Sequence, residues 1–146
     1  MTESGLLLPD VEDPEHAEFW AGCGRGELLV QACGACGKWR MPPRPMCPAC
    51  RSVEVDWVPT SGRGRVWSYI VPHPPLLPAY TELAPYNAIV VELDENPAVR
   101  FVGNLVAAAG APINSIDPAT IQIGEPVHVV FQNIEGVSVP RWVRSA

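Results

Sequence analysis

Four cysteines arranged in two close pairs are the residues of this sequence best suited to chemistry. Cys33 and Cys36 form one C-x-x-C pair, Cys47 and Cys50 form the other, and ten residues lie between the pairs. A two-residue gap lets both thiolates of a tight turn reach the same ion, and two such turns supply the four sulfur ligands of a tetrahedral site. The spacing therefore predicts a ribbon built on a structural Zn²⁺, with no coordination position left open for catalysis.

Other uses of these cysteines stay open from the spacing alone. Two disulfides, a C-x-x-C redox centre and a rubredoxin-like iron site are all chemically feasible. A redox centre usually accompanies a βαβ pattern, which this sequence does not show, and the chain has no export signal that would favour disulfides. The fifth cysteine, Cys23, lies ten residues before the first pair and is expected to be a free, partly buried thiol.

The sequence offers no pattern typical of an active site. It has no H-E-x-x-H, G-x-S-x-G, Walker or dinucleotide-binding glycine motif. The histidines are scattered, and neither His73 nor His128 has an evident acid or nucleophile partner. Asp94 and Glu95 fall in a predicted turn, where solvated carboxylates are expected. We therefore expect a protein that is not itself an enzyme.

Charge is distributed unevenly along the 146 residues, whose net charge is −6. Residues 1–22 hold six acidic and no basic side chains, 23–65 hold seven basic and three acidic, and 66–146 hold three basic and seven acidic. An acidic chain is a poor candidate for nucleic-acid binding, because neutralising phosphates usually requires a basic domain. The chain also has no stretch of about 18 apolar residues that could span a membrane.

The basic centre is interleaved with tryptophans and could bind a partner. Such a face could stack single-stranded nucleic acid, hold the phosphates of coenzyme A, meet an acidic patch of another protein, or simply keep a small ribbon soluble. Its members are Arg40, Arg44, Arg51, Arg63, Arg65, Trp39, Trp57 and Trp67.

The elements that must position these groups are short. Seventeen prolines and twelve glycines disfavour long helices. One short helix is predicted to begin with Asp13 as N-cap and Pro14 at its first position, to carry Phe19 and Trp20, and to end in the glycine cluster at 22–26. Strands are predicted at 27–32, 53–58, 65–71, 87–93, 99–106, 126–131 and 137–143, with an irregular proline-rich connection at 72–85 and a helical turn at 115–120.

The predicted fold class is mainly β. Five β runs after residue 60 are too few for two sheets and suit a small closed barrel. The predicted organisation is an N-terminal helical segment at 1–26, a zinc ribbon at 27–60 and a five-stranded OB-fold barrel at 61–146. The N-terminus lacks the basic leader of a signal peptide, so a cytoplasmic location is expected.

The order of these features resembles the DUF35 family, whose members combine a rubredoxin-like zinc ribbon with an OB-fold. The likeness runs from Phe19-Trp20 through the knuckles around Pro42-Pro43-Arg44 and the Ser61-Gly62-Arg63-Gly64 run to Trp142. The resemblance implies a non-catalytic partner of a thiolase or thiolase-like aldolase that acts on acyl-CoA thioesters, including those of sterol side-chain breakdown. It also implies a MaoC-like hydratase as a further partner.

In that setting the four cysteines carry over as metal ligands, the helix and ribbon meet the enzyme, and the barrel helps to shape the acyl-CoA route. The residues expected to contact the partner or CoA are Phe19, Trp20, Arg40, Arg44, Arg63 and Trp67. Competing hypotheses are a single-strand nucleic-acid binder and a stand-alone acyl-CoA-binding protein, and an independent enzyme comes last.

Overall fold

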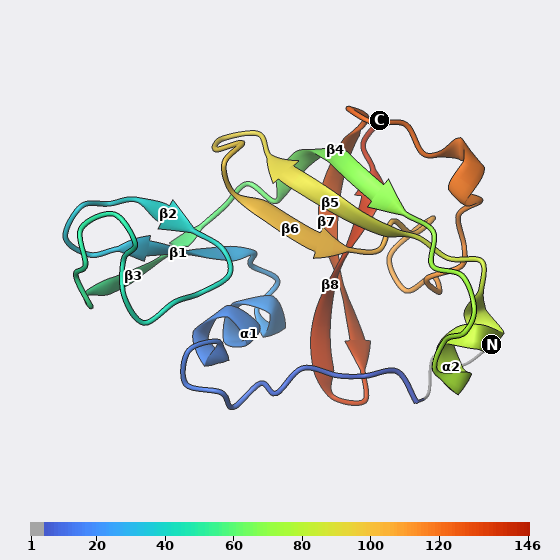
Figure 1. Cartoon of the computed structure of the whole chain (residues 1–146), viewed down its shortest axis with the longest axis horizontal. Helices are drawn as coiled ribbons and strands as arrows, with labels where there is room; N and C mark the ends of the chain where they lie inside the picture. The colour runs from blue at the N-terminus through green and yellow to red at the C-terminus, as the bar shows by residue number, and fades with distance from the viewer. Residues whose placement is uncertain (1–4) are drawn as a thin grey trace.

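A computed structural model describes residues 5–146, and the first four residues of the predicted N-terminal segment lie outside it. The chain forms a three-stranded sheet, a five-stranded sheet and a short helix, α1, that lies between them (Figure 1). The predicted fold class is confirmed: the protein is mainly β, with a four-cysteine ribbon and a curled five-stranded sheet typical of an OB-fold. No helix within residues 5–146 is long and apolar enough to cross a membrane.

The ribbon sheet is antiparallel, in the order β2-β1-β3. Its strands are β1 (Leu29–Cys33), β2 (Trp39–Arg40) and β3 (Val55–Pro59). The first cysteine knuckle is the turn between β1 and β2, and the second lies in the long loop between β2 and β3. Strand pairing therefore brings the two knuckles to one end of the sheet.

The barrel is one antiparallel sheet in the order β6-β5-β4-β7-β8. It curls until Leu105 bridges Trp142 in parallel, where the backbone N–H of Val106 donates to the carbonyl of Trp142 at 2.8 Å. Its strands are β4 (Arg63–Ile70), β5 (Ala88–Leu93), β6 (Arg100–Gly103), β7 (Pro126–Ile134) and β8 (Val137–Arg144).

The start predicted for the N-terminal helix is wrong. Helix α1 spans Ala17–Gly24, and Asp13 instead organises the turn before it. The Asp13 carboxylate accepts the backbone N–H of Glu15 at 3.0 Å, and its carbonyl accepts the backbone N–H of Ala17 at 2.8 Å. These bonds form a turn directly before the helix, which begins at Ala17.

The proline-rich connection at 72–85 is not irregular throughout, contrary to the prediction. It contains helix α2 (Pro78–Leu83), which begins with a proline at a position where a missing N–H costs nothing. Leu83 packs with Tyr86 and Ile113 in a small second core. The predicted turn at 115–120 is present as the 3₁₀ helix η1 (Pro118–Thr120). Burial of an apolar side chain thus stabilises a short helix that composition alone disfavoured.

One hydrophobic core joins the helix, the ribbon and the barrel. Phe19 of α1 stacks on Phe101 of β6 with ring centroids 6.2 Å apart, and Leu28 and Val30 at the start of the ribbon belong to the same buried cluster. Trp142 of β8, 1% exposed, is the largest fully buried side chain among residues 5–146. The ribbon is therefore anchored to the barrel by shared apolar burial.

Candidate functional site

The four ribbon cysteines converge on one point. Their Sγ atoms all lie within 4.8 Å of one another, with Cys33 and Cys50 3.5 Å apart and Cys36 and Cys47 3.7 Å apart. Tetrahedral bonds of about 2.3 Å place sulfurs about 3.8 Å from each other. The spacing of the sulfurs therefore fits a single four-coordinate ion, and the cluster is a candidate metal site.

Backbone amides of the knuckles stabilise thiolates at this site. The N–H groups of Cys36 and Ala35 both lie 3.4 Å from Cys33 Sγ, and these contacts, that of Cys36 foremost, lower the pKa of Cys33 to about 6. The pKa of Cys47 is also lowered, chiefly by the backbone N–H of Cys50. Because metals bind thiolates and not thiols, these backbone contacts favour the metal-binding form of Cys33 and Cys47.

The loop between the knuckles is held by a buried polar network. Gln31 Oε1 accepts the Nε of Arg40 and the backbone N–H of Arg44, and Arg40 Nη2 donates to the carbonyl of Arg44 at 3.1 Å. Arg40 is only 7% exposed, so its guanidinium supports the ribbon from within. Sequence analysis missed Gln31, because a glutamine in an apolar strand carries no motif.

The residues expected to contact a partner or CoA lie in different environments. Phe19 is 7% exposed and belongs to the core, whereas Trp20 is half-buried on α1. Trp67 is 47% exposed on β4. Arg44 and Arg63 are exposed. The structure brings Phe19 and Trp20 into edge-on contact at 5.0 Å, and their binding role stays a prediction.

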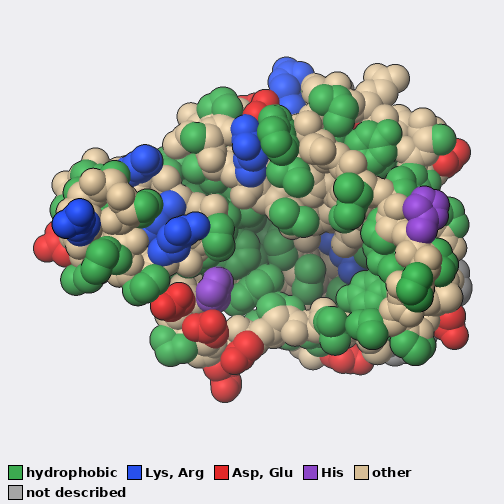
Figure 2. All heavy atoms as spheres, in the orientation of Figure 1, with side chains coloured by type: hydrophobic (Ala, Val, Ile, Leu, Met, Phe, Trp, Pro, Cys, Tyr) green, Lys and Arg blue, Asp and Glu red, His purple; other side chains and the backbone are tan. Residues whose placement is uncertain are grey.

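An apolar hollow, which we call the ribbon–barrel groove, separates the ribbon from β6 and β8. It has a volume of about 360 Å³, and hydrophobic side chains cover the hollowed middle of the face in Figure 2. Arg100 and His16 are the ionisable groups of its lining among the described residues. The lining consists of His16, Phe19, Trp20, Leu28, Met41, Pro42, Pro43, Arg100, Phe101, Val102, Pro140 and Trp142.

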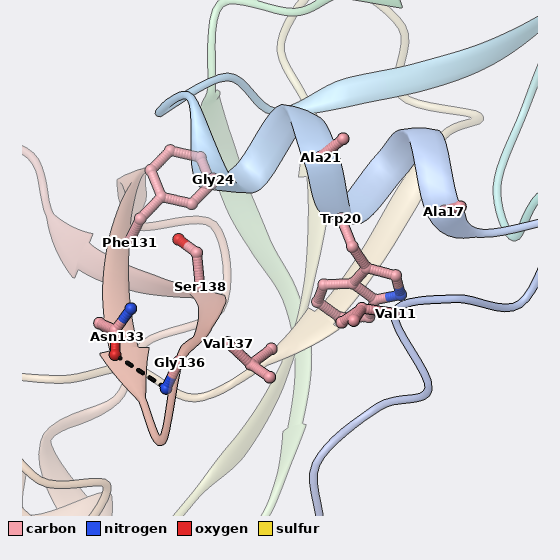
Figure 3. A pocket seen from close by; sticks show the side chains of 10 residues that line it. All are labelled: Val11, Ala17, Trp20, Ala21, Gly24, Phe131, Asn133, Gly136, Val137 and Ser138. Carbon is pink, nitrogen blue, oxygen red and sulfur yellow. Dashed lines mark hydrogen bonds between the residues drawn. The ribbon is translucent and has the colours of Figure 1, made fainter.

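A second hollow, the helix–hairpin groove, lies on the other side of Trp20. It has a volume of about 620 Å³ and separates α1 from the β7–β8 hairpin. Figure 3 shows the small residues Ala17, Ala21 and Gly24 along one side of the helix, with Phe131 and Ser138 on the strands opposite. Trp20 lines both grooves and thus forms the wall between them.

A smaller polar cleft of about 360 Å³ lies beside β4 and the end of β8. His128 Nδ1 lies 3.0 Å from Ser145 Oγ, and Arg63 and Ser61 share the lining. Sequence analysis found no partner for His128, because Ser145 is seventeen residues away and reaches it only through the β7–β8 pairing. No carboxylate side chain lines this cleft within residues 5–146, so the pair lacks the acid that orients a catalytic histidine.

Two family models match consecutive parts of the chain. Residues 20–56 match the rubredoxin-like zinc ribbon domain of ChsH2, and residues 57–132 match its C-terminal OB-fold domain. A DUF35 domain-containing scaffold protein of Methanothermobacter thermautotrophicus is 32% identical over 75% of this chain and 75% of its own.

Longer relatives are also similar. A probable enoyl-CoA hydratase alpha subunit of Thermomonospora curvata is 40% identical over 77% of this chain and 32% of its own length. The 3-oxo-4,17-pregnadiene-20-carboxyl-CoA hydratase alpha subunit of Mycobacterium tuberculosis is 36% identical over 92% of this chain and 42% of its own. The chain thus spans a third to two fifths of the length of these relatives.

Solved structures reproduce the arrangement of ribbon and barrel. A chain of a structure described as the Ltp2-ChsH2(DUF35) aldolase superposes with a TM-score of 0.79 at 34% identity, covering 95% of this chain and 100% of that one. A DUF35 protein of unknown function from Sulfolobus solfataricus, at 13% identity and a TM-score of 0.59, shares the fold.

Proposed function

This chain belongs to the DUF35 family, in which a rubredoxin-like zinc ribbon precedes an OB-fold, and on that premise we propose that it is a non-catalytic accessory subunit. Its partner is an enzyme of the thiolase superfamily, a thiolase or a thiolase-like aldolase, that acts on acyl-CoA thioesters. The chain binds this enzyme and stabilises or completes it, with the barrel helping to shape the route of the acyl-CoA.

The observation that carries the proposal is the match to the aldolase complex. The whole of that DUF35 chain superposes on 95% of this one at 34% identity, so the likeness includes the ribbon, the helix and the barrel together. The name of the methanogen relative, a scaffold protein, supports the same non-catalytic role.

The names of the longer relatives support a finer assignment. One acts on a pregnadiene carboxyl-CoA, which favours a sterol side-chain thioester or another lipid-derived acyl-CoA as the substrate of the complex. Both are hydratase alpha subunits that are more than twice as long as the matched region. A MaoC-like hydratase is therefore proposed as a second member of the assembly.

We assign the four-cysteine cluster to a structural Zn²⁺. The sulfur spacing and the lowered pKa values of Cys33 and Cys47 suit a dication bound by thiolates. Four protein ligands fill a tetrahedral sphere, so the ion orders the knuckles and takes no substrate.

Affinity purification of the tagged chain from its native host, with mass spectrometry of the co-eluting proteins, tests the proposal. A thiolase-superfamily enzyme is expected in stoichiometric amount. That enzyme, produced alone, should be insoluble or should show no activity in thiolysis and retro-aldol assays. Its activity should return when this chain is added, and this chain by itself should show none. An enzyme that is fully active alone, or an eluate rich in nucleic acid, would contradict the proposal.

A further inference from the structure

We propose that Arg40 is the counter-charge of the metal site: its buried guanidinium stabilises the negative charge that the four thiolates keep when they bind Zn²⁺. Four thiolates around one dication leave two negative charges inside the ribbon. The inference rests on the assignment of the cysteine cluster to Zn²⁺ made above. It adds a residue, outside the ligand set, that determines how tightly the ion is held.

Arg40 differs from the other basic residues of the ribbon in its burial. It is 7% exposed, whereas Lys38, Arg44 and Arg51 are exposed. Within residues 5–146, no carboxylate oxygen lies within 4 Å of the Arg40 guanidinium, and its Nη1 is buried without a hydrogen-bond partner. Removing an arginine from water is costly unless an anion lies nearby, and among the described residues carboxylates do not supply that anion.

The pairing of β2 with β1 places Arg40 beside the strand that ends at the first ligand (Figure 1). Arg40 is the cross-strand partner of Gln31, and its Nε donates to Gln31 Oε1. Gln31 and Cys33 are two residues apart on β1, so their side chains leave the same face of the strand about 7 Å from each other. The guanidinium therefore lies on the face of the ribbon that carries Cys33.

Arg40 also contacts the loop that leads to the second pair of cysteines. Its Nη2 donates to the carbonyl of Arg44 at 3.1 Å, and the Arg44 N–H donates to Gln31 Oε1 at 2.7 Å. Arg44 precedes Cys47 by three residues. Hydrogen bonds thus fix the cation between the two segments that carry the thiolates. In this buried position, water and salt screen its attraction to the sulfurs only weakly.

A purely structural role for Arg40 is the alternative explanation. In that case its value lies in the two hydrogen bonds that hold Gln31 and the Arg44 carbonyl, and its charge is incidental. Lysine separates the two roles, because it keeps the positive charge but lacks the planar fork that makes both bonds. Glutamine lacks the charge and cannot reproduce the fork.

Three variants of the full chain test the proposal. Arg40→Gln removes the buried charge, Arg40→Lys keeps it, and Arg44→Gln is the matched control because it removes an exposed guanidinium four residues away. The zinc dissociation constant is measured on the reduced, metal-free chain by competition with a chromophoric chelator at fixed neutral pH. The absorption spectrum of the cobalt-substituted protein shows whether each variant still forms a tetrahedral four-thiolate site.

We expect Arg40→Gln to weaken zinc binding by about tenfold or more, the range typical of residues that support metal ligands. Arg40→Lys and Arg44→Gln should each stay within about threefold of the wild type, since one keeps the buried charge and the other removes only a solvated charge. If Arg40→Gln forms no cobalt site, Arg40→Lys decides: near-wild-type affinity supports the counter-charge, and a loss in both variants overturns it.

Three further results would contradict the proposal. Unchanged zinc affinity in Arg40→Gln would show that the charge is not needed, and equal weakening in Arg40→Gln and Arg40→Lys would show a purely structural role. Equal weakening in Arg44→Gln would assign the effect to net charge. A wild-type chain that binds no zinc would overturn the metal assignment and this inference together, while the accessory role is tested independently by the partner enzyme that co-purifies.

Discussion

Asn87 uses both ends of its side-chain amide on the backbone of Leu105. Its Nδ2 donates to the Leu105 carbonyl at 2.9 Å, and its Oδ1 accepts the Leu105 N–H at 2.7 Å. Both residues are 0% exposed. The side-chain amide thus pairs with the N–H and C=O of Leu105 as a neighbouring strand would. It does so just after β6 ends, where Leu105 bridges Trp142 of β8.

Replacing Asn87 should therefore destabilise the barrel. Asn87→Ala leaves a buried N–H and a buried carbonyl of Leu105 without partners, and we expect a loss of about 2–4 kcal/mol in the free energy of unfolding. Asn133→Ala, at an exposed residue whose Oδ1 accepts the Gly136 N–H at 3.1 Å, should cost less than about 1 kcal/mol. Urea denaturation followed by circular dichroism measures both, and equal losses would contradict the bridging role.

A glycine on β4 should be irreplaceable for steric reasons. A Cβ at Gly64 would meet the carbonyl oxygen of Glu92 and lie 2.6 Å from Val91 Cγ1, both on the neighbouring strand. Gly64→Ala must push β4 from β5, and we expect a loss of about 1–3 kcal/mol in the free energy of unfolding. Gly24→Ala is the matched control, since nothing lies within 4 Å of its Cβ position. Calorimetry should show a lowered Tm for Gly64→Ala alone.

Loss of one ribbon cysteine should open the ribbon and spare much of the barrel. Cys47→Ser removes one of four thiolates, so we expect lower zinc content by elemental analysis with a retained β signal by circular dichroism. Cys23→Ala should keep the zinc, because Cys23 lies outside the cluster of sulfurs. Global unfolding of Cys47→Ser would show that the core shared by Leu28, Val30 and Phe101 couples ribbon and barrel into one unit.

Acid should release the metal. The folded ribbon lowers the pKa of Cys33 from 9.0 to about 6. The Cys33 thiolate therefore contributes its full stabilisation of the ribbon above pH 9, and this contribution decreases as the pH falls from 9 towards 6. Below pH 6 the thiolate is protonated and its contribution is lost. Protons compete with the bound ion for the four thiolates, so zinc released into a colorimetric chelator should rise as the pH is lowered, and because the ion itself favours the thiolates, release should occur below the pKa of the metal-free Cys33. Metal release that does not depend on pH would contradict thiolate ligands.

Cys23 should resist modification while the chain is folded. It is 1% exposed, and burial raises the pKa of its thiol to about 12. After zinc is removed by a chelator, iodoacetamide should label the four ribbon cysteines first and Cys23 only after denaturation. Mass spectrometry of the labelled peptides measures the order, and rapid labelling of Cys23 in the folded chain would contradict its burial.

Local patterns in the sequence determined the mainly β class, the cysteine knuckles and most of the strands. The reason is that each depends on neighbours in the chain: two-residue spacing sets the geometry of a knuckle, and alternating apolar residues bounded by turns specify a strand. Predictions from composition and local pattern were wrong for the two short helices. Helix α2 forms because Leu83 packs in a small core, and α1 begins later than predicted, after a turn in which Asp13 accepts the N–H groups of Glu15 and Ala17.

Only the tertiary structure decided what those elements present to a partner. Arg40 and Phe19, both expected at an interface, are buried: Arg40 contacts Gln31 through the pairing of β1 with β2, and Phe19 contacts Phe101, which is far away in the sequence. Arg100 and Val102 were not singled out, because their exposure beside an apolar hollow depends on how β6, α1 and the ribbon loop meet. The metal site is a property of local spacing, whereas a binding surface depends on which side chains remain uncovered once the core has formed.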